Sequence, residues 1–73
     1  MIEVFKTSLK NQTEADFFAV ALTSVFDEIR ISFDLEDCDR IMRVEGPQIN
    51  PRIIETIARQ LAVDIEILPD TVL

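Results

Sequence analysis

The sequence predicts an α+β fold in which a four-stranded antiparallel sheet carries two helices on one of its faces. Two neighbouring segments alternate between apolar and polar residues, as strands do. Two other segments space their apolar residues as a helix does, and a short apolar segment lies near each end of the sequence. With 73 residues, the chain has room for one domain and not for two, so 1–73 is expected to be a single domain.

The first strand is expected over residues 2–7, although Phe5 breaks the alternation there. A helix should follow from Thr13, whose hydroxyl can cap it, while Asp16 supplies the negative charge that is favourable in a first turn. Helical spacing then defines the stripe of this helix that should be buried, which consists of Ala15, Phe18, Leu22 and Val25.

Two adjacent strands should come next. Residues 29–35 form the clearest half-buried strand, because every second residue is apolar. The acidic sequence Asp37-Cys38-Asp39 then provides a turn, and residues 40–45 return as a third strand. In this third strand Met42 and Val44 should share one face, and Ile41 and Arg43 the other.

A second helix should begin with Asn50 as its cap and Pro51 in its first turn, where the missing N–H of proline costs nothing. Its buried face is expected to consist of Ile53, Ile54, Ile57 and Leu61. Ile65 and Ile67 indicate a short last strand, which Pro69 should close.

This order of elements is that of the ferredoxin-like βαββαβ plait. Right-handed crossovers place the first and third strands at the centre of the sheet and the second and fourth at its edges. The loop after the first strand, the acidic turn and the loop before the last strand should therefore lie at one end of the sheet. A site built from several loops is expected there.

Charge and composition exclude several classes of function. A net charge of −7 disfavours nucleic acid and anionic membrane surfaces as ligands, since phosphates are bound chiefly by clustered lysine and arginine. Without histidine, neither a histidine-dependent triad nor the usual zinc sets of cysteine and histidine are possible within one chain, whose single cysteine is Cys38. No cofactor is expected. The start of the sequence shows no export signal, which favours a cytoplasmic location.

In element order, length and core spacing, the chain resembles the heavy-metal-associated domain of copper chaperones and metal-transporting ATPases. That family carries Met-x-Cys-x-x-Cys between its first strand and first helix. Here Leu9 takes the place of the buried methionine, and Asn11 and Glu14 stand where the two cysteines belong. An amide and a carboxylate are hard ligands with little affinity for copper(I). The resemblance therefore implies the scaffold without metal transfer, and no metal site at Asn11 and Glu14.

We therefore expect a non-enzymatic domain that acts through contact with a protein partner or with a second copy of itself. Phe17 and Val20 should point away from the buried stripe of the first helix, which makes them candidate contact residues. Phe5 and Ile41 are further candidates, since they should project from the sheet face that the helices leave open.

One alternative is a metal-ion site of altered selectivity, built from Glu14 and the turn residues Asp37, Cys38 and Asp39. Against it stands the simpler interpretation of these residues as a solvated acidic hairpin. A second alternative is a sensor of a small metabolite that resembles ACT regulatory domains. The glycine usual in the loop after the first strand of such domains is absent here.

Overall fold

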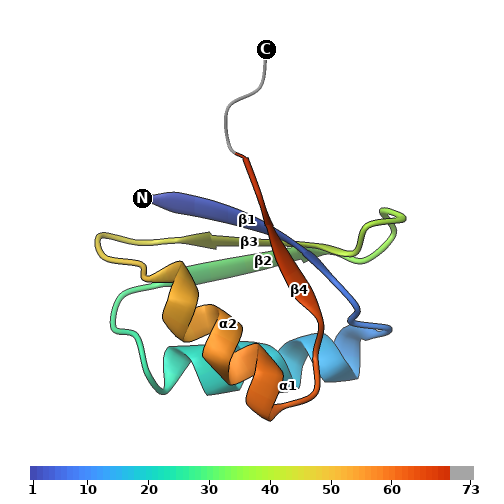
Figure 1. Ribbon diagram of the computed structural model, residues 1–73, viewed down its shortest axis with the longest axis horizontal. Coiled ribbons are helices and arrows are strands. Elements are labelled where there is room, and N and C mark those ends of the chain that lie inside the picture. The colour runs from blue at the N-terminus through green and yellow to red at the C-terminus, as the bar shows by residue number, and fades with distance from the viewer. Residues whose placement is uncertain (70–73) are drawn as a thin grey trace.

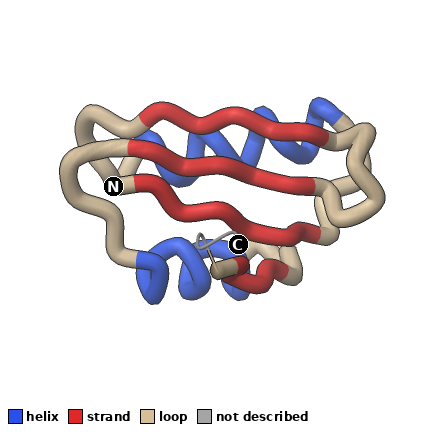
Figure 2. Tube along the Cα trace, turned by 90° about the horizontal axis from the view of Figure 1, so that it is seen from above, coloured by secondary structure: helices blue, strands red, loops and turns tan. Residues whose placement is uncertain are grey.

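The computed structural model describes residues 1–69, and its elements follow the predicted order (Figure 1). They are β1 (Ile2–Thr7), α1 (Gln12–Thr23), β2 (Arg30–Asp34), β3 (Ile41–Glu45), α2 (Pro51–Gln60) and β4 (Ile65–Leu68). The strands form one antiparallel sheet in the order β2-β3-β1-β4, which confirms the predicted places at centre and edge. Both helices lie behind the same face of this sheet (Figure 2), as in a ferredoxin-like plait.

The register of the central strands decides which side chains meet in the core. Phe5 of β1 and Phe33 of β2 both lie opposite Met42 of β3, so the three side chains share the face that the helices cover. Val44 lies on the same face, as predicted. The fully buried side chains come from the sheet, both helices and the loops: Phe5, Leu9, Ala15, Phe18, Leu22, Met42, Val44, Ile54 and Ala58.

The predicted place of Phe5 on the open face is wrong, because this side chain is 0% exposed. Val4 and Phe5 are adjacent apolar residues, so the sequence allows either phase of β1. Pairing with Met42 selects the phase in which Phe5 points towards the helices and Val4 points away from them. Phe5 is therefore a core residue and is not available for contact with a partner.

Two further core assignments are corrected. Val25 is 54% exposed, because α1 ends at Thr23 and the chain turns so that Phe26 packs against the core instead. Ile53 is 40% exposed, and the buried residues of α2 are Ile54 and Ala58. The predicted cap at Asn50 and the place of Pro51 in the first turn of α2 are confirmed.

Neither helix within residues 1–69 combines the length and the apolar character that a bilayer-spanning helix needs.

Truncation of Phe5 tests its place in the core. Phe5→Ala should lower the free energy of unfolding by about 3–5 kcal/mol, since it removes a buried aromatic ring and leaves a cavity. The measurement is urea denaturation followed by circular dichroism. Ile2→Ala is the matched control on the exposed face of the same strand and should cost far less. Equal costs for the two variants would contradict the placement of Phe5 in the core.

Candidate functional site

Three loops meet at the end of the sheet where β1 ends, as the strand order predicts. The backbone N–H of Thr7 lies 3.1 Å from the carbonyl oxygen of Asp39 and 3.2 Å from that of Arg40, so it bonds to the loop between β2 and β3. The N–H of Ser8 donates to the carbonyl oxygen of Asp64 at 2.9 Å, and the N–H of Asp64 donates back to the hydroxyl of Ser8 at 3.0 Å. The loops after β1, before β3 and before β4 are thus joined by direct hydrogen bonds.

Thr7 fixes this junction with its side chain as well. Its hydroxyl donates to the carbonyl oxygen of Arg40 at 2.6 Å and accepts from the N–H of Leu9 at 3.2 Å. Within residues 1–69 it is the one buried polar side chain, and both of its hydrogen-bonding roles are used. The turn after β1 therefore directs Leu9 into the core and places the next residues at the start of α1.

Residues 9–14, which were expected to match the position of the metal-binding motif, contain a helix cap. Asn11 is the N-cap of α1, and its side-chain oxygen accepts from the N–H of Glu14 at 2.9 Å. Glu14 in turn accepts from the N–H of Lys10 at 2.8 Å, in an arrangement close to a capping box. The predicted cap at Thr13 is therefore wrong, because α1 begins one residue earlier, at Gln12. Asn11 and Glu14 are both engaged in holding the helix start.

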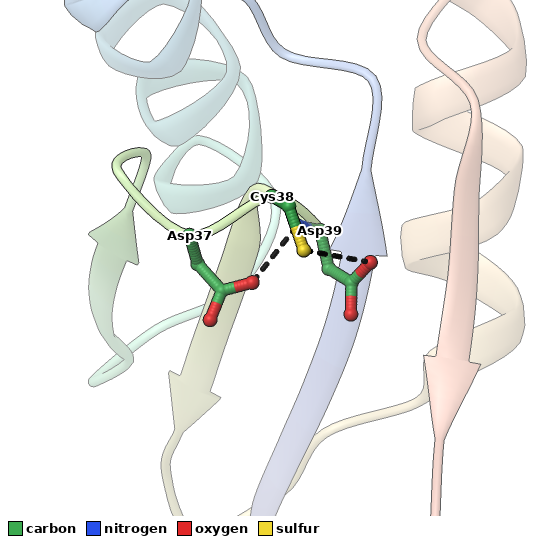
Figure 3. A group of neighbouring side chains, drawn as sticks. All are labelled: Asp37, Cys38 and Asp39. Atoms are coloured by element: carbon green, nitrogen blue, oxygen red, sulfur yellow. Dashed lines mark hydrogen bonds between the residues drawn. The ribbon is translucent and has the colours of Figure 1, made fainter.

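The acidic turn brings three potential metal ligands together (Figure 3). One ligand atom each from Asp37, Cys38 and Asp39 lies within 4.8 Å of the others. Two of these groups already have partners: Asp37 accepts from the N–H of Asp39 at 2.8 Å, and the carboxylate of Asp39 lies 3.6 Å from Nζ of Lys6. Asp37 and Cys38 are exposed, as expected of a solvated hairpin.

Glu14 does not join this group of ligands among residues 1–69. The side chain of Arg40 crosses between the two loops instead, and its Nη1 donates to the carbonyl oxygen of Lys10 at 2.9 Å. A guanidinium at this point repels a second cation, so it opposes a metal site shared by Glu14 and the acidic turn.

The outer face of α1 exposes two large apolar side chains. Phe17 is 65% exposed and Val20 is 67% exposed, while Ala15, Phe18 and Leu22 of the same helix are buried. Beside Phe17 lies an open groove of about 610 Å³ between α1 and the segment that follows α2. Its lining combines apolar side chains with charged groups at the rim, and includes Leu9, Phe17, Phe18, Leu61, Val63, Lys10, Glu14 and Asp64. We call Phe17, Val20 and this groove the α1 surface.

The open face of the sheet is mixed in character. Ile41 lies on it as predicted, opposite Lys6 of β1 and Asp34 of β2, and is half-buried. Arg43 lies on the same face, opposite Val4 and Ser32. Because charged and polar neighbours surround it, Ile41 does not form an apolar patch comparable to the α1 surface.

The sequence did not indicate the groove, because its walls come from segments far apart in the chain. Leu61 and Val63 are separated from Phe17 by more than forty residues, and only the packing of α2 beside α1 brings them together.

Comparisons with known proteins add no relative: no family model matches the sequence, and neither curated proteins nor solved structures gave a significant match.

The cap of α1 can be tested by a pair of substitutions. Asn11→Ala should lower the free energy of unfolding by about 1 kcal/mol, because the N–H of Glu14 loses its acceptor. Thr13→Ala should change it by less than about 0.5 kcal/mol, the usual range for an exposed side chain. Thermal denaturation of the two variants beside the unmodified protein gives both values, and a larger loss for Thr13→Ala would restore Thr13 as the cap.

Proposed function

We propose that this domain is a non-enzymatic protein-interaction module that binds a protein partner through the α1 surface. The observation that carries the proposal is the exposure of Phe17 and Val20, one helical turn apart on the outside of α1. An exposed aromatic residue beside an apolar groove is typical of the anchor positions of protein interfaces.

The negative charge of the chain indicates which residues the partner's contact surface should carry. The helix that carries the α1 surface contains Glu14 and Asp16 but no lysine or arginine, and the whole chain has a net charge of −7. A partner that buries an apolar side chain in the groove would therefore benefit from basic residues around its own contact surface. We infer an apolar segment flanked by lysine or arginine as the partner's contact.

Two features support a role without catalysis. The chain has no histidine, which removes the most common general acid and base. Thr7 is the one buried polar side chain among residues 1–69, and both sides of its hydroxyl are engaged in structural hydrogen bonds.

The proposed scaffold is that of a heavy-metal-associated domain without its thiol pair. Leu9 supports this interpretation, since it is buried at the place of the family's methionine. Asn11 and Glu14 support it too, because the side chain of each accepts a backbone N–H group at the start of α1.

The alternative of metal binding has one supporting observation, the proximity of Asp37, Cys38 and Asp39. The Asx turn of Asp37, the ion pair between Lys6 and Asp39 and the guanidinium of Arg40 all compete with a cation at this turn.

Substitution of Phe17 tests the α1 surface. Phe17→Ser should abolish co-purification of a partner from an extract of the source cell, because it removes the aromatic anchor from the rim of the groove. Ile53→Ser is the matched control, since Ile53 is an exposed apolar residue on α2 outside that surface. Capture of the same partner by both variants, or no partner with the unmodified protein, would contradict the proposal.

Calorimetric titration tests the metal alternative. We expect no binding tighter than millimolar for Zn²⁺, Ni²⁺, Mn²⁺ or Cu(I), because the turn offers only three ligands, and Asp37 and Asp39 already have partners. Cys38→Ser serves as the control variant. Tight binding that this substitution removes would establish the metal site and overturn the expectation.

A further inference from the structure

Strand β2 is the outermost strand on one side of the sheet, and none of the strands within residues 1–69 lies beyond it (Figure 2). Its backbone groups on the outer side are therefore free to pair with another strand. The sequence of β2 is Arg30-Ile31-Ser32-Phe33-Asp34, with opposite charges at its two ends and a small polar residue at its centre. Proline, a bulge or a charged side chain that points towards the core protects many natural edge strands from pairing. Strand β2 has no proline, and its side chains that point towards the core are apolar.

The faces of β2 are settled by its pairing with β3. Ile31 and Phe33 lie opposite the buried residues Val44 and Met42, so they point towards the helices, and both remain only half-buried at the edge. The alternate residues Arg30, Ser32 and Asp34 point to the open face, and all three are exposed.

We propose that two copies of this chain associate through antiparallel pairing of β2 with β2 of the partner subunit, in the register centred on Ser32. Residues that lie directly opposite each other in a sheet point to the same face, so only symmetric registers centred on a residue are possible. The register centred on Ser32 pairs all five residues of the strand. Registers centred on Ile31 or Phe33 pair only three.

The same register matches charge with charge. It places Arg30 opposite Asp34 of the partner subunit on the open face, and the twofold symmetry repeats this ion pair at the other end of the strand. On the helix face, Ile31 lies opposite Phe33 of the partner subunit, an aromatic and β-branched pair of the kind that stabilises antiparallel strands. The half-exposed edge of the core is thereby covered.

The other edge of the sheet is less suited to self-pairing. Strand β4 has four residues and is followed by Pro69, which has no N–H to donate. A symmetric register centred on Glu66 would place two carboxylates directly opposite each other, and the register centred on Ile67 pairs only three residues, against five at β2. A second copy is therefore expected at β2 and not at β4.

This inference does not depend on the α1 surface. A chain that dimerises but captures no protein from an extract would support the β2 interface and contradict the proposed function. Partner capture by a strictly monomeric chain would do the reverse.

Two charge substitutions test the register. Asp34→Arg would set two guanidinium groups opposite each other at both ends of the interface, and Arg30→Asp would set two carboxylates there. Sedimentation should show the unmodified protein approaching twice its chain mass of 8.4 kDa as concentration rises. Each variant alone should dissociate roughly tenfold more readily, or more, because two attractive pairs become repulsive.

Mixing the two variants provides the decisive measurement. One chain then offers two arginines and the other two aspartates, so the mixture should regain a dimer of unmodified strength. Glu66→Arg on β4 is the control and should leave dimerisation unchanged. Circular dichroism verifies that each variant is folded.

An unmodified protein that stays monomeric at every attainable concentration would overturn the inference, as would a mixture no more dimeric than its components. A measurement without substitutions gives a second test, because amide exchange in β2, but not in β4, should slow as the concentration of the unmodified protein is raised. Slower exchange in β4 alone would place the interface at the β4 edge and refute the proposal.

Discussion

The arrangement of this domain depends on the hydroxyl group of Thr7. It joins the end of β1 to the carbonyl of Arg40 before β3, and it accepts the N–H of Leu9 at the start of the next loop. A buried donor without an acceptor costs about 1–3 kcal/mol, which is the cost that the N–H of Leu9 would incur without the hydroxyl of Thr7. Leu9 enters the core directly after this junction, and Asn11 caps α1 two residues later.

Local signals were sufficient for the order of elements and for most of the sheet. The strand around Ile31 and Phe33 and the helix cap at Asn50 could be predicted because both depend on neighbouring residues alone. The face of the sheet on which Phe5 lies could not be predicted, since the adjacent apolar residues Val4 and Phe5 fit two phases of a strand. Only the pairing of β1 with β3, more than thirty residues away, distinguishes these phases.

The start of α1 shows the same limit. Asn11 and Thr13 are both good capping residues, and the sequence alone does not choose between them. In the structure Asn11 is the cap, two residues after Leu9, whose N–H donates to the hydroxyl of Thr7 and whose side chain is buried. In contrast, the exposure of Phe17 and Val20 followed from helical periodicity, because those residues lie opposite a well-defined buried stripe. The groove beside them needed the packed positions of both helices.

The sheet order also has a consequence for the nascent chain. Strand β1 is central, yet one of its neighbours is β4, the last of the four strands to be synthesised, and the bonds between Ser8 and Asp64 span 56 residues. Until the ribosome has released β4, the backbone of β1 has no neighbour on that side and the helix-facing side chains there lack part of their cover. Strand β1 therefore remains without one of its two neighbours until β4 has left the ribosome, and contacts of such long range form slowly even afterwards.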